Sequence, residues 1–122
     1  MATDLCILIR RPPYGSILAA EGIRHLIGAM ANGLNVNAVL MDDGVWVARA
    51  GQSPGATGWT ALSEALGNTF RLADGPAPQV FADEEALTRA GLTAEDLVPG
   101  VSVASPEAVA ELVAAARHLI IF

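Results

Sequence analysis

Two adjacent arginines stand at a point in the sequence where an anion could bind. Arg10 and Arg11 end an apolar run and are followed by Tyr14, Gly15 and Ser16 in the segment ILIRRPPYGS. A helix that begins here offers free backbone N–H groups and a partial positive charge. Glycine lets a ligand approach the backbone closely, and guanidinium groups bind carboxylates and other anions well. The five residues therefore predict a cleft for a small anion or for a partner's carboxylate.

The arginines also have a plainer interpretation. Pro12 and Pro13 stiffen a turn, and one arginine pairs with an acid such as Asp42 or Asp43, which follow the second apolar run. The sequence contains neither G-x-G-x-x-G nor a Walker pattern, so no complete phosphate motif supports a nucleotide site. Both interpretations stay open, and both place the two aspartates near the arginines.

Other reactive residue types are few. Cys6 is the only cysteine and lies inside an apolar run, where we expect a buried and inert thiol. His25 and His118 have no Ser or Cys partner that the sequence reveals, so we assign no catalytic residue. The spacing of Cys and His fits no zinc site, and no metal or cofactor is expected. A lone cysteine cannot form an intrachain disulfide, which favours a reducing compartment.

Two further groups have alternative interpretations. Asp83 opens an acidic cluster at a predicted helix start, where acids complement the helix dipole. Paired-carboxylate chemistry is the alternative. Val45 and Trp46 lie in a glycine-rich region. They are either tucked under a loop or form an assembly interface.

Composition bounds the classes of function. The chain has 122 residues, enough for one domain spanning 1–122, and a net charge of -6. Seven basic residues against thirteen acidic ones argue against direct nucleic-acid binding. The N-terminus lacks the basic start of a signal peptide, and no apolar run approaches the length of about 20 residues that crosses a bilayer. We therefore expect a cytoplasmic protein without membrane contact.

Apolar runs and helix signals alternate along the chain. The predicted strands are residues 5–9, 36–41, 79–82, 101–104 and 118–122. Four helices are predicted between them. The first follows Ser16, the second covers 60–66 with a stop at Gly67-Asn68, the third covers 83–89, and the fourth runs from the Ser105-Pro106-Glu107 start to about 117. We expect a loop after Gly44, with a short extended piece at 45–48. This alternation predicts an α/β fold, with a mostly parallel five-stranded sheet and helices on both faces.

The ordered motifs resemble the DsrE/DsrF-like family, in particular its DsrF/TusC branch. The resemblance rests on RRPPYGS, AAEGIRHLIGAM, MDDGVW and GQ, and continues through LTRAGL and HLIIF over nearly the whole chain. It implies a flavodoxin-like sheet and a trimer or hexamer, either of one chain or mixed with DsrE-like paralogues. It also implies a place in sulfur relay, in which persulfide sulfur passes between protein cysteines.

The resemblance also implies what this chain lacks. Active members carry a cysteine after the third strand, and aligning on LTRAGL places Asp83 near that position. A carboxylate cannot hold sulfane sulfur, so the implied role is a non-catalytic or accessory subunit. A stand-alone homo-oligomer that binds a small molecule or anion is the alternative. A hydrolase or transferase with Asp42, Asp43 or Asp83 as its base is a third hypothesis.

Overall fold

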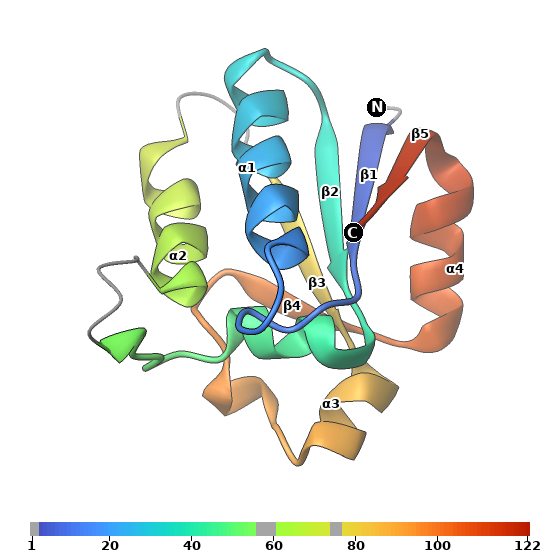
Figure 1. The fold of residues 1–122 in the computed structure, drawn as a ribbon. Coiled ribbons are helices and arrows are strands. Elements are labelled where there is room, and N and C mark those ends of the chain that lie inside the picture. The colour runs from blue at the N-terminus through green and yellow to red at the C-terminus, as the bar shows by residue number, and fades with distance from the viewer. Residues whose placement is uncertain (1–2, 56–60, 74–76) are drawn as a thin grey trace.

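The chain folds around one parallel sheet, as predicted. The computed structural model describes residues 3–55, 61–73 and 77–122. Its elements are β1 (Thr3–Ile9), α1 (Leu18–Ala31), β2 (Val36–Leu40), η1 (Asp42–Ala48), α2 (Leu62–Leu72), β3 (Gln79–Asp83), α3 (Glu84–Ala90), η3 (Ala94–Asp96), β4 (Val101–Ala104), α4 (Pro106–Ala115) and β5 (Ala116–Ile121). The strand order is β4-β3-β2-β1-β5, and every pairing is parallel (Figure 1).

Helices cover both faces of this sheet. Alternate residues of a strand point to opposite faces, so Ile7 and Ile9 pack with α1 and α2, while Cys6 and Leu8 pack with α4. Figure 1 shows α1 and α2 on one side of the strands and α4 on the other. The predicted fold class is confirmed. No helix among the described residues combines the length and apolar character that a membrane crossing requires.

Two helix starts follow their sequence signals. The Ser105 side chain accepts a hydrogen bond from the Ala108 backbone N–H at 3.2 Å, and Pro106 occupies the first turn of α4. Asp83 does the same for α3, since one of its carboxylate oxygens lies 3.1 Å from the Ala86 nitrogen. Each cap satisfies a backbone donor that the first turn of a helix leaves without a partner.

The segment after β2 differs from the prediction. The sequence indicated a loop with an extended piece at 45–48, whereas the structure forms the 3-10 helix η1 there. Val45, Val47 and Ala48 are fully buried in this conformation, so contacts with the core decide the local structure. A short run of apolar residues does not by itself distinguish a strand from a helical turn.

The second helix also runs further than predicted. α2 passes through Gly67 and Asn68, where a stop was expected, and ends at Leu72. Thr69 is buried within it, and Phe70 packs against the core, so tertiary contacts outweigh the weak helix propensity of glycine. The predicted start at Thr60 lies outside the described residues. At the other end of the chain, α4 stops at Ala115 and β5 takes over the residues that were assigned to its last turn.

Candidate functional site

The strand order reverses next to β1, and Arg10 and Arg11 follow the carboxyl end of that strand. The chain adds β2, β3 and β4 on one side of β1 and then places β5 on the other side. In open α/β sheets, ligands bind beyond the carboxyl ends of the strands at such a point. A cavity of about 420 Å³ opens there, lined by Arg10, Arg11, Pro12, Leu18, Asp42, Asp43, Ile121 and Phe122. Four of the predicted cleft residues therefore line one cavity.

The charges in this cavity are partly paired. Arg10 Nε donates to one carboxylate oxygen of Asp42 at 2.8 Å, and the other oxygen lies 3.7 Å from a guanidinium nitrogen of Arg89. The plainer interpretation, an arginine paired with Asp42, is therefore present. Arg11 forms no ion pair with any residue that the structure describes. Arg11 is thus the cation that remains available to an incoming anion.

The backbone of η1 limits the cavity to the part of the sheet edge where β1 and β5 end. A Cβ atom added to Gly44 would lie 2.0 Å from the carbonyl oxygen of Ile9, so η1 crosses directly against the end of β1. Asp42 enters this crossing with a φ of 51°, a left-handed conformation that is uncommon outside glycine. η1 also contacts β2, β3 and α3, and Figure 1 shows it across the carboxyl ends of the strands. η1 therefore lies where a larger ligand would bind at this edge of the sheet.

The turn before α1 lies next to the cavity but does not line it. Gly15 has a φ of 86°, which favours glycine, and Tyr14 is 49% exposed. The Ser16 hydroxyl accepts from the Leu18 backbone N–H at 3.1 Å, although the N-cap position itself belongs to Ile17. None of the three residues is among those that line the cavity. These three residues form the turn that connects Arg11 to α1.

Asp83 is held away from the arginines. Its side chain caps α3, only 5% of the residue is exposed, and it does not line the cavity of Arg10 and Arg11. The carboxyl end of β3 was a reasonable place to expect a cleft residue. The helix that begins directly after it recruits the carboxylate instead. The structure thus does not bring Asp83 into this cavity.

The single thiol is inaccessible, as predicted. Cys6 is 0% exposed and packs with Leu8, Val39 and Val109 beneath α4. Burial raises the pKa of the Cys6 thiol, because a low-dielectric surrounding disfavours the thiolate. A thiol acts as a nucleophile through its thiolate. Cys6 is therefore fully buried, in surroundings that disfavour its thiolate.

Val45 and Trp46 contribute to the core of the folded chain. Val45 has no exposed surface, and Trp46 is half-buried against the larger core cluster. Among the described residues, the large apolar side chains that do reach the surface lie elsewhere, mainly at the start of α1 and along β5.

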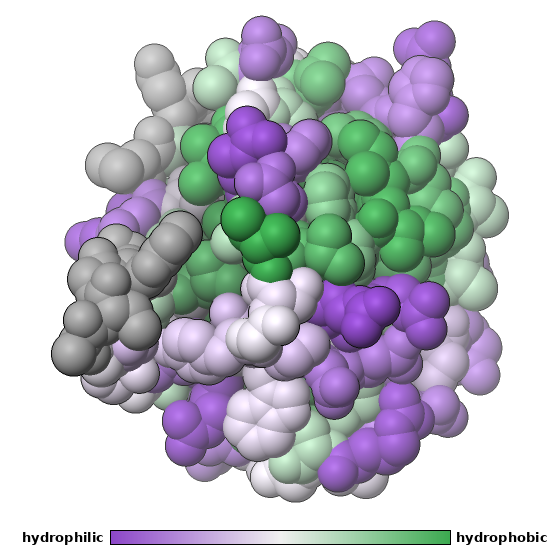
Figure 2. All heavy atoms as spheres, in the orientation of Figure 1, coloured by the Kyte–Doolittle hydropathy of each residue, from purple (hydrophilic) through white to green (hydrophobic). Residues whose placement is uncertain are grey.

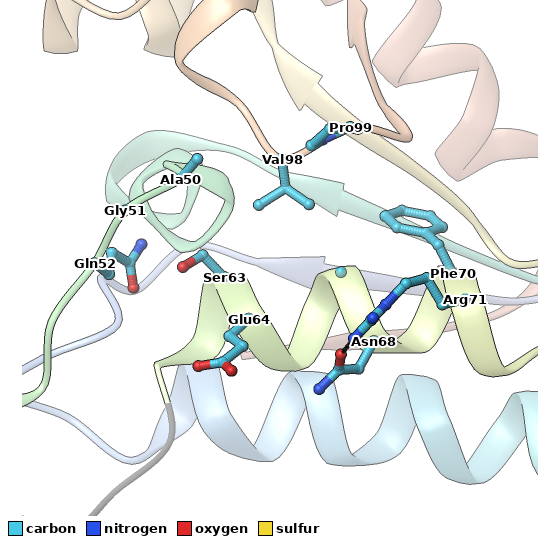
Figure 3. A pocket seen from close by; sticks show the side chains of 11 residues that line it. Ala50, Gly51, Gln52, Ser63, Glu64, Asn68, Phe70, Arg71, Val98 and Pro99 are labelled. Atoms are coloured by element: carbon cyan, nitrogen blue, oxygen red, sulfur yellow. Dashed lines mark hydrogen bonds between the residues drawn. The ribbon is translucent and has the colours of Figure 1, made fainter.

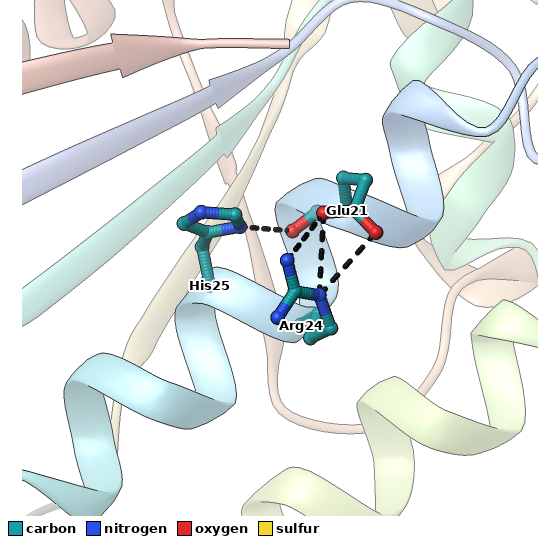
Figure 4. Close-up of polar contacts among 3 residues, drawn as sticks. All are labelled: Glu21, Arg24 and His25. Carbon is teal, nitrogen blue, oxygen red and sulfur yellow. Dashed lines mark hydrogen bonds and ion pairs between the residues drawn. The ribbon is translucent and has the colours of Figure 1, made fainter.

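The two histidines lie in different surroundings. His25 Nδ1 donates to the Glu21 backbone oxygen at 2.7 Å, and its ring lies 4.9 Å from that of Phe122. Figure 4 shows Arg24 bonded to the Glu21 carboxylate on the outer side of α1, which lowers the pKa of Glu21. His118 is exposed on β5. Among the described residues, no three potential metal ligands gather into a site.

A second cavity was not predicted. It measures about 500 Å³ and lies between α2 and the segment that follows η1, where Gln52, Ser63, Asn68 and Arg71 are among its lining (Figure 3). Gln52 donates to the backbone oxygens of Trp46 and Val47, and its own amide oxygen has no hydrogen-bond partner among the described residues. Its lining joins the GQ motif to residues of α2, a helix whose length was underestimated, so the sequence did not predict this cavity.

Comparisons with known proteins agree with the fold and with the motifs. Residues 3–122 match the model of the DsrE/DsrF-like family. A TusC homolog of Vibrio parahaemolyticus is 31% identical over 98% of this chain and 99% of its own length. The intracellular sulfur oxidation protein DsrF of Allochromatium vinosum is 33% identical over 75% of this chain, which spans 65% of that relative.

A solved structure shows the same architecture. The ychN protein from E. coli has a TM-score of 0.83 and 21% identity, covering 98% of this chain and 99% of its own. At that identity the likeness supports the fold alone. The family match over nearly the whole chain and the TusC homolog, which is 31% identical over almost its full length, decide the membership. This chain belongs to the DsrE/DsrF-like family.

Proposed function

We propose that this chain is an accessory subunit of a sulfur-relay assembly, one that helps to build or gate the complex without carrying sulfur itself. The family membership and the similarity to a sulfur oxidation protein support the sulfur chemistry. The observation that carries the accessory role is the state of the only cysteine, which is fully buried beneath α4. A persulfide carrier needs a thiolate that a partner can reach.

The residue type at position 83 supports the same proposal, although the residue there is only 5% exposed and does not line the cavity of Arg10 and Arg11. The motif LTRAGL aligns Asp83 near the place where active family members carry their cysteine. A carboxylate there caps α3 and forms no bond to sulfane sulfur. In this proposal, the helix start that would lower the pKa of a catalytic cysteine is kept, while the reactive atom is absent.

The proposal includes partners and a location. The chain works in the cytoplasm within a trimer or hexamer that contains cysteine-bearing DsrE-like paralogues. A reducing compartment suits a chain with one buried thiol and no second cysteine with which to form a disulfide.

Persulfide loading tests the accessory role. The chain is mixed with a cysteine-bearing paralogue from its own genome, treated with glutathione persulfide, and both chains are weighed by intact-mass spectrometry. We expect the mass of one added sulfur atom on the paralogue and none on this chain, because Cys6 is inaccessible. Light scattering should show the two chains in one complex.

The Cys6→Ser variant is the control for this experiment. It should assemble and behave as the unmodified chain does. Sulfur on this chain that disappears in Cys6→Ser would contradict the proposal, as would a paralogue that never joins the complex.

A stand-alone anion-binding role is the second candidate, favoured by the exposed Arg11 in the cavity, which forms no ion pair with the described residues. In that case, Arg11→Gln should weaken binding of thiosulfate or sulfate about 10-fold to 100-fold, because hydrogen bonds to charged groups contribute roughly 1.5–3 kcal/mol. Isothermal titration calorimetry measures the affinity. Arg24→Gln, which removes an exposed arginine paired with Glu21 on α1, serves as the matched control. Equal affinity in both variants would exclude this role for the cavity.

A further inference from the structure

The outer edge of β5 carries exposed apolar side chains on both of its faces. Leu119, Ile120 and Ile121 are 41%, 38% and 57% exposed. Leu119 and Ile121 pair with Cys6 and Leu8 and so point to the α4 face, whereas Ile120 points to the α1 face. Figure 2 shows a broad hydrophobic area on the side of the molecule where β5 lies. A helix or loop on one face would cover only half of this surface.

The backbone of β5 also has groups free for pairing. Phe122, directly after the strand, donates to the Leu8 oxygen at 2.8 Å and accepts from the Arg10 nitrogen at 2.8 Å. Backbone groups alternate in direction along a strand, so Ile120 also faces β1. The N–H and C=O groups of Leu119 and Ile121 therefore point outward. Among the described residues, none pairs with this edge of the sheet.

The neighbouring helices leave the edge open. On one face, α4 contacts β1, β4 and β5, yet Leu119 and Ile121 of β5 remain largely exposed on that face. On the other face, α1 packs on β1 and β2. A further strand can thus join β5 without first displacing a helix.

We propose that a second copy of this chain pairs with β5 in antiparallel fashion, about a two-fold axis that passes beside Ile120. In this register Leu119 lies opposite Ile121 of the second copy, and the outward groups of these two residues form the hydrogen-bonded pair. Ile120 faces its own counterpart in a non-hydrogen-bonded pair. The two sheets become one, and apolar side chains meet on both faces. The pairing does not depend on any role in sulfur relay.

The charges favour this arrangement over a parallel one. Arg117 is the only Lys, Arg, Asp or Glu residue in β5 and lies three residues from the axis. At about 3.4 Å per residue, the two copies of Arg117 are held roughly 20 Å apart, beyond the Debye length of about 8 Å at physiological salt. Parallel strands in register would place the two arginines side by side. Exposed edges that avoid pairing usually carry charges, and residues 118–121 carry neither Lys nor an acid.

A single cysteine tests the register. Ile120→Cys in the Cys6→Ser background should form an intermolecular disulfide under mild oxidation, seen as a dimer on a non-reducing gel. A non-hydrogen-bonded antiparallel pair separates Cα atoms by about 4.5 Å, which lies within the range of about 4.4–6.8 Å that disulfides accept. His118→Cys is the matched control, because it lies on the same face but about 13 Å from its counterpart. It should stay monomeric on the gel.

A proline tests the backbone pairing. Leu119→Pro removes an outward N–H group and leaves the hydrogen bonds to β1 in place, since proline is tolerated where an edge N–H faces solvent. Light scattering should give the mass of two chains for the unmodified protein and of one chain for the variant. Ile120→Lys should do the same if the proline variant fails to fold.

Three results would overturn the proposal. They are a monomeric unmodified chain, equal cross-linking at positions 118 and 120, or cross-linking of Ile120→Cys only to a different protein. The persulfide experiment is unaffected by each of these results, so the two proposals fail independently.

Discussion

Replacing Gly44 with alanine is expected to destabilise the fold by about 3 kcal/mol or more, the range of severe core lesions. The new Cβ would lie 2.0 Å from the Ile9 carbonyl oxygen and 2.7 Å from its carbon, and both atoms belong to the backbone of a central strand. The same oxygen accepts a hydrogen bond from the Met41 nitrogen at 3.0 Å. Relieving the clash must move η1 away from the sheet and break that bond. Chemical denaturation measures the loss.

Gly28→Ala is the control for this prediction. Gly28 lies inside α1, and a Cβ there meets no atom within 4 Å. Alanine favours a helix interior over glycine by roughly 0.8–1.0 kcal/mol, so this variant should be more stable than the unmodified chain. If Gly44→Ala unfolds at the same denaturant concentration as Gly28→Ala, η1 does not press on β1 as described.

Cys6 is expected to react with a thiol reagent at least about 10³-fold more slowly in the native chain than in the unfolded chain. Its side chain is 0% exposed, so labelling must wait for opening of the α4 face. Domains with a stability of about 5 kcal/mol or more populate the open form less than once in roughly 10³ molecules. The raised pKa of the Cys6 thiol acts in the same direction, since less thiolate exists at a given pH.

Stopped-flow labelling with a chromogenic disulfide measures this ratio. Ser102→Cys in the Cys6→Ser background provides an exposed thiol on β4 and should react at nearly the unfolded rate. If the native Cys6 thiol reacts as fast as the thiol introduced at position 102, it is accessible, and the main support for an accessory role is removed.

The sheet was predictable because its strands are short apolar runs with clear boundaries. The Ser105-Pro106 start gave α4, and the runs around Cys6 and Val39 gave central strands buried on both faces. The prediction failed for η1 and for the length of α2. In both places, contacts with distant residues override a local signal: η1 is held by buried valines against β1, and Gly67 lies in a helix that packs on Val98.

The candidate site was predictable only in part. Arg10 and Asp42 follow neighbouring parallel strands, so their pairing could be expected from the order of the strands alone. The direction in which a side chain points could not be expected from the order of the strands. Asp83 ends the next strand along the sheet, yet its carboxylate turns to cap α3 instead of entering the cavity. The second cavity joins residues of α2 to Gln52 and Val98, which are far apart in the sequence, so no local pattern defines it.

The pairing of β1 with β5 sets the order in which the chain can complete its fold during synthesis. β1 is translated before β2, β3 and β4, which lie on one side of it in chain order. The other edge of β1 must wait for residues 116–121, since Thr3 pairs with Ala116 and Leu8 with Ile121. Until then, β1, which is an interior strand of the finished sheet, presents an unprotected edge. Chaperones that shield extended apolar segments therefore have their best opportunity in that interval.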